Sequence, residues 1–366
     1  MTGLERKLGI GVIGAGGIAH YAHFPNLAKN PRVNLVAVAD VDSSRAKAAA
    51  EQYGIPHQYA DYEEVIANPE VEAIIVTSWP TAHAGPVIAA AQAGKHILCE
   101  KPIATTLEDA DAMVAAAEQA GVKFTMGYQP RFGNVWPTVK RLIDEGLIGR
   151  PMLLNTIGAG PSSHGAKWFL QKQFAGGGIF MDWGIYTAFS LNYWMGPVER
   201  VYATSKIFRD EVLVRGELVT GIDVEDTIAA TLTFKNGAIG NWSSAWAVKA
   251  RHGTTVIDGD GGSILMRSGQ DGIGVYTTQL DDPDYLMGWR QLPVSDPTVV
   301  DMHYRKIAHL VDSVLDDTPL VLTGADGRDA LELVLATYKS AETGEAVNLP
   351  LPRGEITAIS PDVQVA

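Results

Sequence analysis

The sequence predicts an α/β fold with two domains. Residues 1–127 are expected to form a doubly wound parallel sheet, and residues 128–366 an α/β domain with a large, mostly antiparallel open sheet. Three observations predict this. Apolar strands alternate with helices through the first 127 residues, a glycine-rich turn follows the first strand, and longer strands rich in Thr and Val begin near Pro151. A chain of 366 residues is long enough for two cores.

In the first domain, apolar runs predict strands at residues 9–13, 34–39, 71–77, 96–100 and 123–127. Helix-compatible segments lie between them, including residues 18–29, an alanine-rich stretch ending at Gly54, and residues 84–93. Thr105 with Glu108 has the spacing of a capping box for the helix that runs to about Ala120. Continuous apolar strands joined by helices predict a parallel sheet that is covered on both faces.

The segment GAGGIA, residues 14–19, follows the first strand and opens the first helix. Gly14 permits a tight turn, Gly16 lets the backbone approach a pyrophosphate, and Gly17 with Ile18 begins a helix whose N–H groups attract anions. In this strand and helix context the pattern predicts a Rossmann dinucleotide site. A glycine-rich turn without a ligand is the alternative.

Asp40 ends the second strand, where an acidic side chain accepts hydrogen bonds from the adenosine ribose. Its charge repels a 2′-phosphate, so NAD is favoured over NADP. Arg45 lies nearby in the sequence and weakens that preference.

In the second domain, strands are expected at residues 152–157, 198–208, 227–234, 238–246, 254–258, 263–267 and 274–278, and helices at about 301–315 and 327–342. Alternation along 227–234 leaves one face buried and one exposed. Asn236-Gly237 predicts a type I′ hairpin turn. An open sheet must cover its exposed face, so we expect two copies of the chain to associate sheet to sheet.

Composition limits the classes of molecule that this protein can be expected to bind. A formal net charge of −13 argues against nucleic acid and anionic membranes, which need a basic surface, and favours a small-molecule substrate. The single cysteine, Cys99, excludes an intramolecular disulfide and a cysteine-rich metal site. No metal is expected. Because there is neither a long apolar run nor a leader-like N-terminus, we expect a cytoplasmic protein.

Five segments resemble landmarks of the glucose/fructose oxidoreductase and inositol dehydrogenase family, Gfo/Idh/MocA. They are GVIGAGGIA near the N-terminus, AGKHILCEKPIA at 93–104, GYQPRF at 127–132, AGGGIFMDWGIY at 175–186 and SAETGEAVNLPL at 340–351. The resemblance implies that Lys101, within Glu100-Lys101-Pro102, is the lysine beside the nicotinamide and the reacting hydroxyl. It also implies an unusual backbone geometry at Pro102, and a homodimer or homotetramer formed through the sheet of the second domain. The alternative is a solvated surface lysine.

The family usually has Asp, three residues and then His, whereas this chain has Asp182 and Tyr186. Tyrosine at this position is similar to the glucose/fructose oxidoreductase and dihydrodiol dehydrogenase branches. A spacing of four residues on a helix places both side chains on one face. We therefore expect Lys101 and Tyr186 to be a proton-transfer pair, with Asp182 binding a substrate hydroxyl. In the alternative, Tyr186 only packs or hydrogen-bonds while Lys101 does the acid/base work.

The resemblance also implies supporting contacts. Cofactor contacts are expected from Ser78, Trp79, His83, Glu100 and Gln129. Arg131 is expected to reach the substrate. Trp168 is either an apolar wall for a sugar ring or a core residue, and His164 is either a substrate contact or a surface residue. The acidic cluster is expected to be a solvated loop: Asp281, Asp282 and Asp284.

The expected activity is reversible hydride transfer between NAD and a secondary hydroxyl of a sugar, sugar derivative or cyclitol. Two alternatives remain open. One is an NADP-linked sugar ketoreductase or dihydrodiol dehydrogenase, which the tyrosine suggests. The other is a non-catalytic sensor that binds a dinucleotide.

Overall fold

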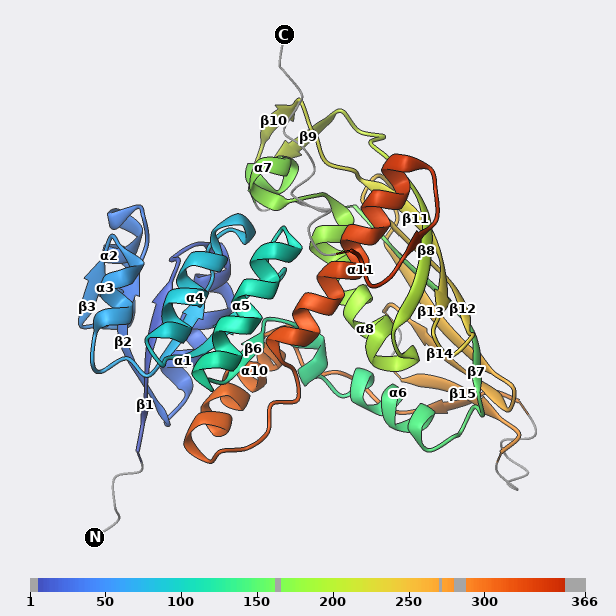
Figure 1. The fold of residues 1–366 in the computed structure, drawn as a ribbon, viewed down its shortest axis with the longest axis horizontal. Coiled ribbons are helices and arrows are strands. Elements are labelled where there is room, and N and C mark those ends of the chain that lie inside the picture. The colour runs from blue at the N-terminus through green and yellow to red at the C-terminus, as the bar shows by residue number, and fades with distance from the viewer. Residues whose placement is uncertain (1–5, 162–165, 270–271, 280–287, 353–366) are drawn as a thin grey trace. The chain divides into compact units, whose positions relative to one another are not determined.

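The computed structural model describes residues 6–161, 166–269, 272–279 and 288–352. These residues form two compact units (Figure 1). The first comprises the described residues up to Phe132 together with Thr298–Arg328. The second comprises Gly133–Pro297 and the described residues from Asp329 onward.

The first unit contains, among its described residues, a six-stranded parallel sheet in the order β3-β2-β1-β4-β5-β6. Its strands are β1 (Leu8–Ile13), β2 (Val33–Ala39), β3 (His57–Tyr59), β4 (Ala73–Val76), β5 (His96–Cys99) and β6 (Phe124–Met126). The sheet is doubly wound and parallel, as the sequence predicted. The chain changes direction across the sheet between β1 and β4, and ligands of such folds bind outside the carboxyl ends of the strands at that point.

Helices cover both faces of this sheet. They are α1 (Phe24–Lys29), α2 (Ser43–Tyr53), α3 (Tyr62–Ala67), α4 (Ala84–Gln92), α5 (Leu107–Ala120) and α10 (Val299–Leu315). Side chains of α1, α2 and α10 share a buried core with β1, while α3 contacts α4 and α4 contacts α5. Two details differ from the prediction. The expected helix over 18–29 begins with a π-helical turn, Ala19–His23. The residue that caps α5 is Thr106 rather than Thr105, and its hydroxyl accepts a 3.1 Å hydrogen bond from Asp109 N.

The expected domain division assigned all residues after 127 to the second domain, but α10 belongs to the first unit. Its buried face places Ile307, Leu310 and Val311 in the core beside Leu8 and Ile10 of β1. Apolar residues three or four positions apart form one stripe along a helix, and here that stripe packs on the parallel sheet. The segment Thr298–Arg328 therefore belongs to the first unit, although it follows the second unit's strands in the sequence.

The second unit contains, within its described residues, a nine-stranded mixed sheet in the order β16-β15-β14-β13-β7-β12-β11-β8-β17, and a hairpin of β9 (Glu211–Val214) with β10 (Glu217–Thr220). The strands of the large sheet are β7 (Pro151–Ala159), β8 (Val198–Lys206), β11 (Thr227–Phe234), β12 (Ile239–Ala245), β13 (His252–Gly259), β14 (Gly262–Arg267), β15 (Ile273–Thr277), β16 (Arg290–Leu292) and β17 (Val347–Asn348). β7 and β12 pair in parallel, and the other pairs are antiparallel. The sheet is thus mostly antiparallel, as predicted.

The hairpin between β11 and β12 exists, but its turn is not type I′. Gly237 has a φ of 87°, whereas Asn236 does not have the positive φ that a type I′ turn needs. Gly237 N donates to Phe234 O at 2.9 Å, and Phe234 N donates to Ala238 O at 2.9 Å. These bonds close a three-residue loop in which only the glycine is left-handed.

One face of the large sheet is covered and the other is exposed. The helices of this unit are α6 (Val135–Asp144), α7 (Lys172–Ala175), α8 (Ile185–Met195) and α11 (Gly324–Thr343), which begins in the first unit. On the covered face, Phe180 stacks on Trp242 with ring centroids 3.8 Å apart. Alternate residues of β11 face outward. Among the described residues, no helix combines the length and apolar character needed to span a bilayer.

Candidate active site

The turn after β1 requires glycine at its first position. Gly14 has a φ of +100°, a conformation that residues with side chains rarely adopt. A Cβ there would lie 2.9 Å from the backbone N of Ser78. The hydroxyl of Thr77 also donates a 2.6 Å hydrogen bond to Gly14 O. The turn is therefore fixed against the carboxyl end of β4.

The next two glycines leave the backbone open. A Cβ on Gly16 or Gly17 would meet no atom of the described residues within 4 Å. Ile18 is half-buried and directly precedes the π-helical turn. The first N–H groups of a helix have no partner within it and attract anions. This loop fits the diphosphate of a dinucleotide.

Asp40 follows β2, and both its carboxylate oxygens accept backbone hydrogen bonds. Oδ2 accepts from Ala15 N at 2.8 Å, and Oδ1 accepts from Asp42 N at 2.9 Å. The carboxylate is thereby tied to the glycine turn. Arg45, expected to weaken the preference for NAD, has its Nε 3.4 Å from a carboxylate oxygen of Asp42.

The loop after β4 carries Ser78, Trp79 and His83. Trp79 is 42% exposed, whereas His83 is fully buried. His83 Nδ1 lies 2.9 Å from Pro102 O, and Nε2 lies 3.1 Å from Ser78 O. Burial lowers the pKa of His83. The ring lies between the carbonyl groups of Ser78 and Pro102 and so packs the loop after β4 against the loop after β5.

Glu100-Lys101-Pro102 follows β5, and the Lys101-Pro102 peptide bond is cis. Glu100 is only 5% exposed. Its Oε1 accepts a 2.5 Å hydrogen bond from Lys306 Nζ and lies 2.8 Å from His23 Nε2. Its Oε2 accepts from Lys101 N at 3.3 Å. The carboxylate therefore fixes the backbone of Lys101 from inside the unit.

Charge in this buried cluster is balanced. Burial by itself would raise the pKa of Glu100, but the ammonium of Lys306 and the hydrogen bond with His23 outweigh it and hold that pKa well below its usual range. Burial, followed by the charge of Lys306, lowers the pKa of His23 and brings that of His303 to about 3. The cluster thus contains one anion, one cation and two neutral imidazoles.

Sequence reasoning missed Lys306, His23 and His303. A signal for the lysine was available, because Lys306 stands four residues after Met302 and four before Leu310 on the buried face of α10. A charged residue within an apolar stripe calls for a buried partner. Nothing local pointed to Glu100 as that partner, because the two residues are 206 positions apart.

Gln129 and Arg131 follow β6 in a 3₁₀ turn, Gln129–Phe132, and both are half-buried. The first unit therefore gathers its predicted site residues at the carboxyl ends of β1, β2, β4, β5 and β6. This is the edge at which parallel α/β sheets bind ligands.

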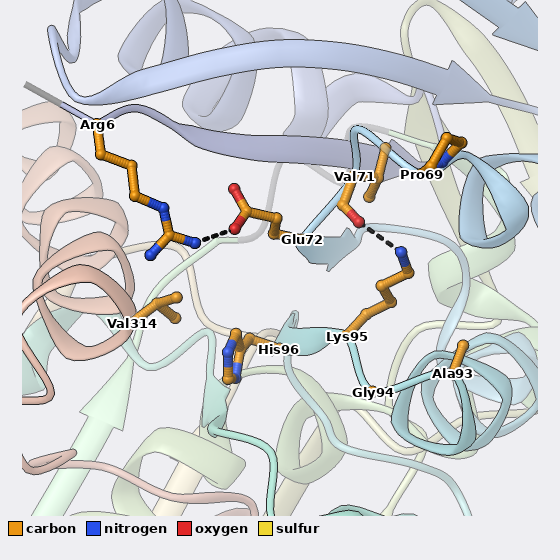
Figure 2. Close-up of a pocket in the computed structure, with 9 residues that line it drawn as sticks. All are labelled: Arg6, Pro69, Val71, Glu72, Ala93, Gly94, Lys95, His96 and Val314. Atoms are coloured by element: carbon orange, nitrogen blue, oxygen red, sulfur yellow. Dashed lines mark hydrogen bonds and ion pairs between the residues drawn. The ribbon is translucent and has the colours of Figure 1, made fainter. Parts of the chain in front are cut away.

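A cavity of about 300 Å³ in the same unit lies elsewhere (Figure 2). Glu72 and His96, which line it, stand at the amino ends of β4 and β5. Arg6 forms an ion pair with Glu72, and Lys95 Nζ donates to Val71 O at 2.6 Å (Figure 2). The charged side chains of Arg6, Glu72 and Lys95 that line the cavity are thus already bound within the protein. The cavity lies at the edge of the sheet opposite the glycine turn.

The other predicted site residues belong to the second unit. Trp168 is half-buried in the 3₁₀ turn Lys167–Leu170, where its ring stacks on Phe169. His164 and the acidic cluster at 281–284 lie outside the described residues.

Asp182 and Tyr186 lie in one continuous helical segment. Asp182 is in a π-helical turn, Phe180–Gly184, and Tyr186 is in the first turn of α8. Both are half-buried, whereas the neighbouring Met181 and Ile185 are buried. The segment is therefore helical but not α-helical throughout, and π-helical turns occur frequently at functional sites.

Comparison with known proteins covers almost the whole chain. The model of an oxidoreductase family with an NAD-binding Rossmann fold matches residues 8–128, and the Gfo/Idh/MocA C-terminal domain matches residues 136–265. The myo-inositol 2-dehydrogenase of Thermotoga maritima is 32% identical over 93% of this chain and 98% of its own. The 1,5-anhydro-D-fructose reductase of Ensifer adhaerens is 29% identical over 86% of this chain and 91% of its own.

Solved structures agree with the fold. Aldose-aldose oxidoreductase from Caulobacter crescentus, complexed with glycerol, superimposes with a TM-score of 0.78 at 29% identity, covering 94% of this chain and 100% of the other. A levoglucosan dehydrogenase in complex with NADH and levoglucosan gives 0.82 at 24% identity over 94% of this chain and 100% of the other, a likeness of fold. Both family models match, and a relative is 32% identical over 93% of this chain, so the chain belongs to the Gfo/Idh/MocA family of NAD-binding oxidoreductases.

Proposed function

We propose that this protein is an NAD-dependent dehydrogenase that acts on a secondary hydroxyl of a sugar, sugar derivative or cyclitol. The observation that carries the proposal is the position of Lys101 at the carboxyl end of β5, with its backbone held by the buried Glu100. The names of two similar proteins, a myo-inositol dehydrogenase and an anhydrofructose reductase, support this substrate class.

In this proposal, the loop Gly14–Ile18 binds the diphosphate of NAD, Asp40 binds the adenosine ribose, and His83 and Glu100 hold the loops beside the nicotinamide. NAD, when bound there, would supply the acceptor for the hydride that leaves the carbinol carbon. Lys101 donates a hydrogen bond to the reacting oxygen and, with Tyr186, moves its proton. Asp182 binds a neighbouring hydroxyl. Ser78, Trp79 and Gln129 contact the nicotinamide half, and the substrate side is completed by Arg131 and Trp168.

A panel of sugars and cyclitols, scored by the absorbance of NADH, tests the activity. We expect turnover with at least one member. Binding of NAD without turnover of any member would favour the sensor, and turnover only with NADP would favour the ketoreductase or dihydrodiol dehydrogenase.

Changing Asp40 to serine is expected to weaken NAD binding about tenfold to a hundredfold, because a charged hydrogen-bond acceptor for the ribose is lost. Affinity for NADP should stay the same or rise, since the repelling charge is gone. Titration of both dinucleotides, followed by quenching of tryptophan fluorescence, measures this. Asp42→Ser is the matched control. Asp42 caps α2, and serine is also a favourable residue at a helix N-cap. A wild-type preference for NADP would contradict the role of Asp40.

We further propose that the exposed sheet face joins two copies of the chain. Tyr202 of β8, Ile157 of β7 and Ile239 of β12 are 46%, 38% and 53% exposed. Light scattering after size exclusion should show a homodimer or homotetramer. Ile157→Lys would place a charge in such an interface and should shift the protein toward the monomer, whereas Thr231→Ser on the same face should not. A wild-type monomer would contradict this assembly.

A further inference from the structure

The glycine run that leads into the helical segment of Asp182 and Tyr186 is enclosed by two side chains. A Cβ on Gly177 would overlap the hydroxyl and ring of Tyr338. A Cβ on Gly178 would overlap the backbone oxygen of Glu225 and lie 2.9 Å from its carboxyl carbon. The two glycines are thus required by these neighbours.

The start of a helical segment leaves four backbone N–H groups without partners in the helix. Here the first bond inside the segment runs from Asp182 N to Gly178 O, at 3.1 Å. The four N–H groups before it all donate to Glu225 or Tyr338. Gly178 N donates to Glu225 Oε2 (2.8 Å), and Phe180 N donates to Glu225 Oε1 (3.1 Å). Ile179 N donates to the backbone oxygen of Glu225 (3.2 Å), and Met181 N donates to the Tyr338 hydroxyl (3.0 Å). Two residues therefore satisfy the whole beginning of the segment.

Glu225 and Tyr338 are also bound to each other and to fixed elements. The Tyr338 hydroxyl donates to Glu225 Oε1 at 2.7 Å. Burial, followed by the charge of Glu225, raises the pKa of Tyr338 well above its usual range, so the hydroxyl keeps its proton and remains a donor. Tyr338 lies on α11 and is 8% exposed. Next to Glu225, the buried carboxylate of Asp226 accepts from the backbone N of Phe208 and of Arg209 at 3.0 and 2.8 Å.

We propose that Glu225 and Tyr338 are positioning residues, which set the location of Asp182 and Tyr186 by fixing the backbone of residues 178–181. This inference rests on the proposed function, in which Asp182 and Tyr186 act on the substrate. A displacement of about 1 Å in a catalytic group can cost a hundredfold in rate, so the support of this segment matters for turnover.

Two substitutions that preserve size test the proposal. Glu225→Gln replaces one of the two accepting carboxylate oxygens by an NH₂ group, which would face a backbone N–H of the segment and could not accept from it. Tyr338→Phe removes the hydroxyl that accepts from Met181 N. We expect kcat to fall about tenfold to a hundredfold in Glu225→Gln and less in Tyr338→Phe. NAD affinity should stay at the wild-type value, because the proposed cofactor residues belong to the other unit.

Glu332→Gln is the matched control. Glu332 is 6% exposed on the same helix, α11, and its Oε1 accepts from Leu351 N at 2.9 Å. It makes a comparable buried bond to a backbone N–H that is not in the helical segment of Asp182. If Glu332→Gln lowers kcat as much as Glu225→Gln does, general destabilisation explains the loss and the proposal is overturned.

Hydrogen–deuterium exchange gives a readout that does not depend on activity. Amides 178–186 should exchange faster in Glu225→Gln than in the wild type, and those of the control should not. Unchanged exchange, or faster exchange with unchanged kcat, would overturn the proposal. If the wild type turns over no sugar or cyclitol, the proposed function fails and so does positioning for that reaction. Faster exchange would then show only that Glu225 holds the segment.

Discussion

Replacing Lys101 with alanine is expected to lower turnover about 10²- to 10⁴-fold, the range that a general acid or base contributes. The variant loses the hydrogen bond to the developing alkoxide and the group that relays the proton. NAD binding should be retained, because the proposed diphosphate and ribose contacts come from the glycine turn and Asp40. Steady-state rates on the best substrate of the panel, with NAD titration, measure both effects.

Lys95→Ala is the matched control for that variant. Lys95 precedes β5 at its amino end, whereas Lys101 follows its carboxyl end, and Lys95 Nζ donates to Val71 O (Figure 2). Its removal should leave turnover unchanged. Equal losses in the two variants would refute a special role for Lys101. Tyr186→Phe, measured alongside, separates the two interpretations of the tyrosine: a loss as large as that of Lys101→Ala indicates a proton-transfer pair, and a small loss indicates packing.

Replacing Lys306 with methionine is expected to destabilise the protein by about 3–5 kcal/mol, because it leaves a buried carboxylate without its cation. Lys306 is fully buried, and its ammonium lies 2.5 Å from Glu100 Oε1. Urea unfolding of the full chain measures the change. The double variant Lys306→Met/Glu100→Gln removes both charges and should recover most of the loss. A cost below about 1 kcal/mol, the size typical of surface substitutions, would contradict the buried pair.

The loss in Lys306→Met should also grow as the pH rises from acid to neutral. In the wild type, the pKa of Glu100 lies well below its ordinary value of 4.5, so its stabilising effect is present above that value and disappears as the pH falls through the folded-state pKa. Without Lys306, the effect of burial on Glu100, which favours the neutral acid, loses its main opposing charge, so ionisation of Glu100 stabilises the fold less as the pH rises. Unfolding measured across this range should therefore show the two proteins diverging. A constant difference would contradict the assignment.

Local patterns predicted most of the first unit. The positive φ of Gly14 could be predicted from the local pattern of a glycine-rich turn after a strand, whereas its close approach to Thr77, 63 positions away, could not. The position of Lys101 after β5 was also predictable from a local pattern. The π-helical turn at Ala19–His23 was not, because the periodicity of apolar residues does not separate a π turn from an α turn.

What the sequence did not predict depends on contacts between distant residues. Glu100 with Lys306, and Glu225 with Tyr338, are pairs separated by 206 and 113 positions. Each partner alone is an ordinary charged or aromatic residue. The hairpin β9–β10 was not predicted either. Its Leu213 and Leu218 face outward, so apolar residues stand where a half-buried strand usually has polar ones. Asn236-Gly237 was assigned the wrong turn because the dipeptide also suits a three-residue loop.

A crystal structure of the protein with NADH and the best substrate of the panel tests the central claim most directly. The account predicts the diphosphate on the turn Gly14–Gly16 and the Lys101 amine about 3 Å from the reacting oxygen, within hydrogen-bonding distance. A Lys101 amine in bulk solvent, or a glycine turn that binds no diphosphate, would contradict it.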